Sequence, residues 1–355
     1  MNDTPRRELW ADSARGLAII AVVLGHVFLQ QDPGARWELW APAQDAWVGL
    51  RDLLLPVRMP LFFLLAGYFA AHVIHRPWQT VLRTRTLNLY YLYLVWLLVQ
   101  TAFFAFVPHA GTASATSVRD LFGQLTYAPS NLWFLVALAL YFVIAKAGMK
   151  VAPLMLVGAG ALSFLAFAGR VPAVLETTPM PEYLVFFLLG AYAPGLLRSI
   201  RPRVSLVVGG FTALVLGVLA MDAVDDRMLW TAFLLLSSVA GVTALVALLK
   251  MLEVHDRLPR LTMSIGRRTL PIYVTQLPLV IGVDALIDLL PARAAQQIFG
   301  GPVASWVYPI VVTAVVIGVA LAIHHGLSRA VPWMYRAPWL TKGVSARRLP
   351  VPSGV

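Results

Sequence analysis

The sequence predicts an all-α polytopic integral membrane protein with about ten transmembrane helices and both termini in the cytoplasm. Three observations carry this prediction. The 355-residue chain is 59% hydrophobic and only 13% charged, with a mean hydropathy of +0.75. Its apolar residues fall into about ten stretches of roughly 17–25 residues, the length of helix that crosses a bilayer. Its basic residues are distributed unevenly between alternate connections.

Lipid must surround much of the chain, because a soluble domain of this size has too little interior to hide so much apolar surface. The spans are placed near 13–30, 52–74, 86–107, 131–147, 151–169, 183–198, 204–221, 229–250, 265–288 and 303–327. Pro271, Pro278 and Pro309 are expected to break the last two spans. The spans form one transmembrane domain, residues 1–330, and residues 331–355 are expected to be a disordered, basic cytoplasmic tail.

The basic residues set the orientation. With the N-terminus in the cytoplasm, most of the 28 lysines and arginines lie on the inner side. The outer connections hold only Arg36, Arg51, Arg119, Arg170, Arg227 and Arg293. The net charge of +11 therefore reflects topology, and no nucleic-acid partner is expected. Cysteine is absent, which excludes disulfides and thiolate metal sites, and no metal is expected.

Two costly polar residues lie in the first span, "ADSARGLAIIAVVLGHVFLQ": Arg15 and His26. A charge at the centre of a bilayer costs about 2.5–3.5 kcal/mol on insertion scales. Arg15 and His26 are eleven residues apart, which in an α-helix places them on the same face and about 16 Å apart along the axis. Asp12 lies near that face. One polar stripe is thus expected to run from the inner surface to His26 in the outer half, and Asp12, Arg15 and His26 are its candidate catalytic residues. Each residue also has an ordinary interpretation, Arg15 as a snorkelling charge and His26 as an interhelical hydrogen-bonding group.

Arg58, in "PVRMPLFFLLAGYF" of the second span, is expected at the same depth as His26. The hairpin between the two spans makes these helices neighbours. A guanidinium at this place would stabilise a developing oxyanion. The alternative is an ion pair with an outer acid such as Glu38 or Asp45.

Five further residues are candidates for binding. Tyr273 and Gln276 of the ninth span are expected level with His26, and Trp133 opens the fourth span at the outer surface, either beneath an acceptor or as a belt residue. At the inner side, Arg83 and Arg85 suit a cytosolic ligand that carries phosphates, although inner arginines are more often topogenic.

These residues occur in segments that resemble, in order, the membrane acyltransferase-3 family, and most closely its fucose O-acetylase-like branch. The segments are Arg15 to His26 with "VVLGH", "MPLFFLLAGYF" (59–69), "NLWFLVAL" (131–138), "FFLLGAY" (186–192) and "RRTLPIYVTQLPL" (267–279). The chain departs from the family in having Arg58 and Gln276 where histidines are frequent, and R-x-R instead of R-x-x-R at 83–85.

The resemblance implies an O-acyltransferase of the inner (cytoplasmic) membrane. Such an enzyme moves an acyl group, usually acetyl, from cytosolic acetyl-CoA to a hydroxyl of an extracytoplasmic or lipid-linked carbohydrate. His26 matches the essential histidine and Arg15 its paired arginine, while Arg85 and Arg83 match arginines at the CoA end. No permanently bound cofactor is expected, and any second-step extracytoplasmic transferase would be a separate protein.

Two function classes remain open from the sequence. In an enzyme, His26 either deprotonates the acceptor hydroxyl for direct attack or takes the acyl group transiently, and Arg58, Tyr273 or Gln276 polarises the thioester carbonyl. The alternative is a transporter or flippase for a lipid-linked sugar or small polar substrate. The spacing of Arg15 and His26 and the basic inner rim favour the enzyme.

Overall fold

The computed structural model describes residues 8–31, 40–107, 112–115, 117–126, 130–172, 178–222 and 225–341. Within them every regular element is a helix and no strand occurs. The long helices are α1 (Leu9–Gln31), α3 (Ala41–Ala70), α5 (Leu87–Phe106), α7 (Trp133–Gly148), α8 (Ala152–Phe167), α10 (Met180–Tyr192), α12 (Pro202–Asp222), α13 (Arg227–Val254), α15 (Thr269–Ile287) and α17 (Pro302–Ala330).

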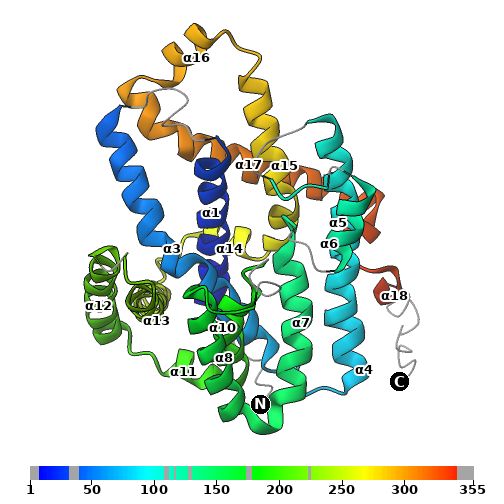
Figure 1. Ribbon diagram of the computed structural model, residues 1–355, viewed down its shortest axis with the longest axis vertical. Helices are drawn as coiled ribbons and strands as arrows, with labels where there is room; N and C mark the ends of the chain where they lie inside the picture. Colours follow the sequence, from blue (N-terminus) through cyan, green and yellow to red (C-terminus); the bar gives the residue numbers. More distant parts are fainter. Residues whose placement is uncertain are drawn as a thin grey trace, which may run out of the picture.

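Short elements connect these helices. They are α4 (Trp78–Val81), the π-helix η1 (Leu82–Thr86), α6 (Val118–Thr126), η2 (Met149–Val151), α11 (Pro194–Ser199), α14 (Arg260–Gly266), α16 (Ala292–Phe299), η3 (Pro332–Met334) and α18 (Pro338–Thr341). In Figure 1, α16 lies at one end of the molecule and α4 at the opposite end.

Each predicted span has a helix in the structure, which confirms a polytopic all-α membrane protein. In the described part of the chain, eight stretches of helix are long and apolar enough to cross a bilayer. One of them, 133–167, contains both α7 and α8, and the chain turns back between them, where Gly148 lies against Met155. The 13 residues of α10 are fewer than a bilayer crossing needs.

The prolines of the last two spans do not break them. Pro271 lies in the first turn of α15, where a missing backbone N–H costs nothing, and Pro278 and Pro309 lie inside continuous helices. Figure 1 shows α17 crossing the bundle obliquely. The predicted interruptions are therefore absent from the backbone.

The predicted tail begins with an ordered segment. Residues 331–341 form η3 and α18, which pack against α5, and Trp96 donates a hydrogen bond from Nε1 to the carbonyl of Met334 (2.8 Å). Aromatic side chains account for this order, since the ring of Tyr335 packs against Trp96 (centroids 5.5 Å apart). Residues 342–355 lie outside the described residues.

Helix α1 lies at the centre of the bundle and contacts α3, α13, α14, α15 and α17. Its crossing with α14 is close because both helices carry glycine there. A Cβ added at Gly16 would lie 2.0 Å from the carbonyl oxygen of Thr262, and one added at Gly266 would lie 1.8 Å from that of Asp12. Two glycines let α3 and α10 approach in the same way, at Gly67 and Gly190. The two contacts fix α1 and α3, which carry most of the candidate site.

Helix α12 shows where lipid lies. Only 6% of its most apolar window is buried, and its packing is almost entirely with α13. Its outward side chains are apolar, among them Val204, Val207, Phe211 and Leu214. An apolar face left without a protein partner is expected on a helix that faces acyl chains.

Candidate functional site

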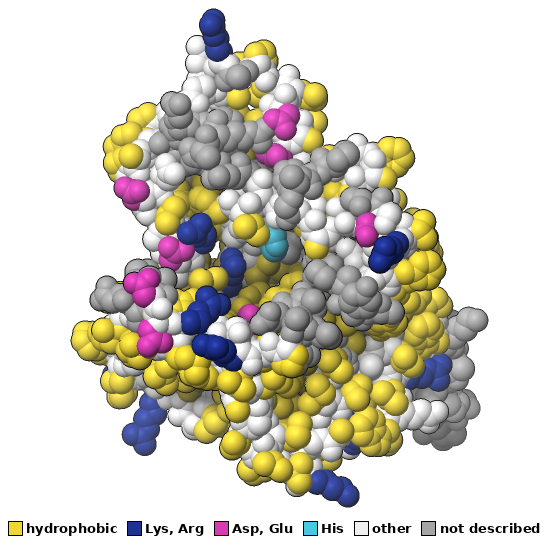
Figure 2. Space-filling model, in the orientation of Figure 1, with side chains coloured by type: hydrophobic (Ala, Val, Ile, Leu, Met, Phe, Trp, Pro, Cys, Tyr) yellow, Lys and Arg dark blue, Asp and Glu magenta, His cyan; other side chains and the backbone are white. Residues whose placement is uncertain are grey.

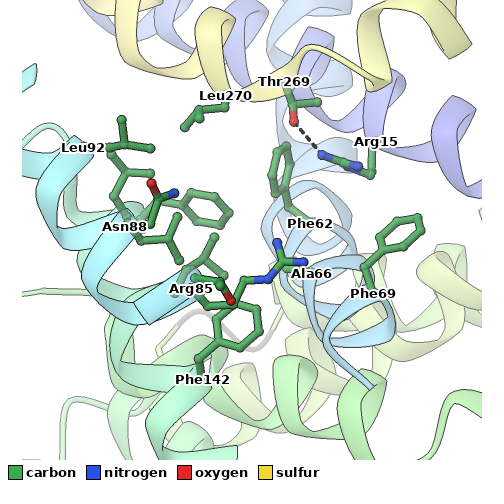
Figure 3. Close-up of a pocket in the computed structure, with 15 residues that line it drawn as sticks. Arg15, Phe62, Ala66, Phe69, Arg85, Asn88, Leu92, Phe142, Thr269 and Leu270 are labelled. Atoms are coloured by element: carbon green, nitrogen blue, oxygen red, sulfur yellow. Dashed lines mark hydrogen bonds between the residues drawn. The ribbon is translucent and has the colours of Figure 1, made fainter. Parts of the chain in front are cut away.

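A cavity of about 290 Å³ lies between α1, α3, η1, α5, α7 and α15. Its polar lining consists of Arg15, Thr84, Arg85, Asn88 and Thr269, and the remaining walls are apolar or aromatic. Figure 3 shows the guanidinium groups of Arg15 and Arg85 reaching this space from α1 and η1. No acid is among the described lining residues, so the cavity presents two positive charges and suits an anionic ligand.

Arg15 is held in place from two sides. Its Nη2 donates a hydrogen bond to Oγ1 of Thr269 (3.0 Å), and its Cζ lies 5.3 Å from the ring centroid of Phe69. Thr269 is the first residue of α15, directly after the short helix α14. The glycine crossing of α1 and α14 therefore sets the distance at which Arg15 meets its partner.

Asp12 holds the same junction together. Its Oδ2 accepts a hydrogen bond from Nε of Arg267 (3.1 Å), and the Asp12 side chain is only 7% exposed. One residue later, the hydroxyls of Ser13 and Thr262 lie 2.7 Å apart. Asp12 does not line the cavity, so its place in the structure is that of an anchor between α1 and the α14–α15 junction.

The structure separates Arg83 from Arg85. Arg85 lines the cavity, with its Cζ 5.9 Å from the ring centroid of Phe142. Arg83 points away from it, and its Nη2 donates to the carbonyl of Trp339 in α18 (3.1 Å). Both arginines lie in the π-helix η1, a local widening that often marks functional sites.

His26 lies on the same face of α1 as Arg15, after Ile19 and Val22 at helical spacing. Its Nδ1 is 2.9 Å from the carbonyl oxygen of Val22. A carbonyl only accepts hydrogen bonds, so Nδ1 carries the proton of the neutral ring. The lone pair of Nε2 is then the basic site of this side chain.

Arg58 lies beside His26, as the sequence predicts. A Cβ added at Gly25 would be 2.1 Å from Nη1 of Arg58, so the guanidinium occupies the space that the glycine leaves open. The groups that act electrostatically on it are Tyr183 and Arg51, and Arg58 in turn acts on His26. The predicted alternative, an ion pair with Asp45, does not occur, and Glu38 lies outside the described residues.

The route from the large cavity to His26 is closed by two phenylalanines. The rings of Phe62 and Phe134 meet edge to face, with centroids 4.9 Å apart, and both line the large cavity. Beyond them, Ile19 and Val22 line a second cavity of about 10 Å³, which has room for about one water molecule. The predicted polar stripe therefore has an apolar middle, and only its two ends are polar.

The remaining candidates take different places. The hydroxyl of Tyr273 donates to the carbonyl of Asn131 and accepts from the backbone N–H of Phe134 (both 3.3 Å). Tyr273 lines the small cavity with Ile19 and Val22, which places it one turn inward of His26 and not level with it. Because its hydroxyl is engaged at the start of α7, Tyr273 supports the wall that closes the route.

Gln276 and Trp133 also differ in their surroundings. The Gln276 side chain is 2% exposed, and its Oε1 has no hydrogen-bond partner within the described part of the chain. An orphaned buried oxygen is costly and indicates a polar ligand or a water. Trp133 stacks on Tyr183 (centroids 6.1 Å apart), the residue that also acts on Arg58. Trp133 therefore belongs to an aromatic wall beside Arg58.

Sequence reasoning missed several residues at these places. Phe62 and Phe134 have the sequence character of ordinary core residues, and Asn88, whose Oδ1 accepts a hydrogen bond from the backbone N–H of Ala337 (3.0 Å), is a polar residue near the start of the third span. Tyr183 and Glu182 begin α10 and were unremarkable. The one available signal was Glu182, an acid at the edge of an apolar helix.

Comparison with known proteins decides the family. The family described as an acyltransferase domain, acyltransferase-3, matches residues 8–325. The chain belongs to this family. It is also similar to the inner membrane protein YcfT of Escherichia coli (strain K12), with 26% identity over 329 residues that cover 82% of this chain and 86% of the relative. No solved structure matches the chain.

The family match covers the whole candidate site of this acyltransferase. It begins one residue before α1 and ends within α17, so it includes both cavities, His26 and the cluster around Arg58. The apolar helices and the relative together make this acyltransferase a multi-pass membrane protein.

Proposed function

We propose that this acyltransferase moves an acetyl group from cytosolic acetyl-CoA to a hydroxyl of an extracytoplasmic or lipid-linked carbohydrate, in the inner membrane. The observation that carries the proposal is the arrangement of Arg15, Arg85 and His26. Two arginines line a cavity at the end of the bundle that the positive-inside rule assigns to the cytoplasm, and a histidine whose Nε2 is the basic nitrogen of its neutral ring lies beyond it.

The large cavity suits the donor. The phosphates of acetyl-CoA need cations, which Arg85 and Arg15 supply, and Asn88 adds an amide. The aromatic walls suit the uncharged arm that carries the thioester. For the acetyl group to reach His26, the arm must pass between Phe62 and Phe134, so these rings must rotate apart when the donor binds.

His26 supplies the base. Nε2 takes the proton of the acceptor hydroxyl, the oxygen attacks the thioester carbonyl, and the C–S bond breaks with the proton passing to the thiolate. The Val22 carbonyl holds the ring in the tautomer that this step needs. If Nε2 attacks the thioester first, the same nitrogen carries the acetyl group and then passes it to the hydroxyl.

The groups able to stabilise the oxyanion are fewer than the sequence suggests. Tyr273 is engaged with Asn131 and Phe134. Gln276 and Arg58 remain, and the amide N–H of Gln276 or the guanidinium of Arg58 would donate to the developing charge.

The test is acetyl transfer by the purified protein in lipid nanodiscs, with acetyl-CoA and an envelope glycan extract. Acceptor-dependent release of CoA is expected, and His26→Ala should lower its rate by about 10²–10⁴-fold. His75→Ala is the matched control, because His75 is exposed in the turn after α3. Normal transfer by a well-folded His26→Ala variant would refute the role of His26, and no CoA release with any extract would favour transport. Acid quenching during turnover separates the two routes, since only one leaves acetyl on the protein.

A further inference from the structure

Arg58 is a cation in the membrane-spanning helix α3, and the described part of the chain places no counter-charge against it. It takes part in no hydrogen bond or ion pair with another residue in the described ranges. Its neighbours are the phenol of Tyr183 and the like-charged Arg51, with which it lines a cavity of about 10 Å³ against Gly25. Charged residues inside membranes almost always pair or face a substrate path.

The neighbouring arginines do have acidic partners. Arg51 is paired with Asp52 (Nε to Oδ1, 2.9 Å), and Arg227 lies within electrostatic reach of Glu182. Among the residues that the structure describes, Arg58 is therefore the cation of this cluster that has no acidic partner. Figure 2 shows basic side chains along one wall of a hollow in this face of the molecule, with a histidine at its edge.

The charge of Arg58 lies next to His26, the proposed base. Arg58 interacts electrostatically with His26. Its guanidinium occupies the space left by the missing side chain of Gly25, here called the Gly25 notch, next to that histidine on α1. Trp133 and Tyr183 form an aromatic wall near Arg58, in which the ring of Tyr183 also stacks on Phe63. A hydroxyl presented to Nε2 would thus bring the groups next to it against a cation.

We propose that the acceptor is anionic, with a carboxylate or a phosphate close to the hydroxyl that is acylated, and that Arg58 is the residue that binds it. This inference rests on the proposed function and narrows its acceptor class. An uncompensated cation costs free energy in the free protein, and an anionic acceptor recovers that cost only when it binds. A neutral acceptor would leave the charge of Arg58 unused.

The first experiment identifies the acceptor without touching Arg58. Envelope glycans and lipids are compared by mass spectrometry between cells that express the wild-type protein and cells that express His26→Ala. The compound that loses one acyl group is expected to carry a carboxylate or a phosphate. A neutral compound would overturn the anionic acceptor and leave the acyltransferase intact, whereas no acyl difference would overturn the proposed function itself.

The second experiment uses that compound with the purified protein, both as isolated and with its anion removed, by methyl esterification for a carboxylate or phosphatase for a phosphate. Removal of the anion should raise the KM of the wild-type protein for the acceptor by about 10-fold or more. Arg58→Gln should raise the KM for the charged acceptor similarly, leave the KM for acetyl-CoA unchanged, and have little further effect on the neutral form. Arg58→Lys should restore part of the affinity.

Arg293→Gln is the control, because it removes an outer arginine that lies in α16 and outside both cavities. If Arg58→Gln does not fold, as judged by size exclusion, Gly25→Ala displaces the guanidinium while keeping its charge, and the same rise in KM is expected. An equal loss of kcat on charged and neutral acceptors would assign Arg58 to the oxyanion and overturn the proposal.

Discussion

The guanidinium of Arg58 lies in the space that the missing side chain of Gly25 leaves on α1, where an added Cβ would come within 2.1 Å of Nη1. The two residues lie on adjacent helices, and the contact brings a cation from α3 next to His26. Gly25 therefore matters because its missing side chain leaves room for the guanidinium of Arg58.

Gly25→Ala should displace Arg58 and slow acyl transfer several-fold, while the fold stays intact because only the end of a flexible side chain must move. Alanine in a helix also gains about 0.5–1 kcal/mol over glycine. Steady-state kinetics with a thermal midpoint measures both effects. Gly49→Ala in α3 is the control, since a Cβ there meets nothing within 4 Å. Equal rates for the two variants would contradict the role of the notch.

Arg85→Gln should raise the KM for acetyl-CoA by about 10-fold or more, because it removes one of the two charges of the large cavity. Arg83→Gln removes the same charge two residues away, where the side chain contacts Trp339, and should change that KM much less. The measurement is the KM of each variant at saturating acceptor. A larger effect at Arg83 would mean that the donor binds outside this cavity.

Phe62→Leu and Phe134→Leu should widen the passage between the large cavity and His26. The expected result is faster transfer from butyryl-CoA relative to acetyl-CoA, because a branched aliphatic side chain leaves more room than an aromatic ring. Competition between the two donors measures the ratio. Phe104→Leu, a buried phenylalanine in a separate cluster with Leu277 and Ile281, is the control. An unchanged ratio in both passage variants would place the acyl route elsewhere.

Gly16→Ala should destabilise the protein by several kcal/mol, since its Cβ would lie 2.0 Å from a backbone oxygen that has no freedom to move. It should also weaken donor binding, because pushing α14 away moves Thr269 from Arg15. Thermal unfolding in nanodiscs checks the first effect and the KM for acetyl-CoA the second. Gly210→Ala on α12, which meets nothing within 4 Å, should be neutral or slightly stabilising.

The sequence predicted the helices well and their interactions poorly. Hydropathy and helical periodicity are local properties, so the spans and the common face of Arg15 and His26 follow from them. The family followed from the resemblance of the ordered motifs. The proline breaks failed, because α15 and α17 retain helical geometry around Pro278 and Pro309 when neighbouring helices support them. The order of residues 331–341 was missed because it depends on Trp96, far away in the chain.

The level of Tyr273 was misjudged for a similar reason. The depth of Tyr273 was predicted by counting residues from the end of its span, which assumes that all helices begin in one plane. The first residue of α15, Thr269, instead lies beside Arg15, six residues after the start of α1. The separation of Arg83 from Arg85 also escaped the sequence, since it depends on where α18 packs.

The amino-acid sequence by itself determined that this is a polytopic membrane protein with an arginine and a histidine on one face of its first helix, because hydrophobic length and helical periodicity suffice for that. The acyltransferase family followed from the resemblance of the ordered motifs and not from these patterns. Only the tertiary structure decided that Arg85 joins Arg15 at one cavity, that Phe62 and Phe134 close the route to His26, and that Arg58 lies at Gly25. These relationships depend on close contacts between helices distant in sequence, which steric fit at a few glycines determines and no local pattern encodes.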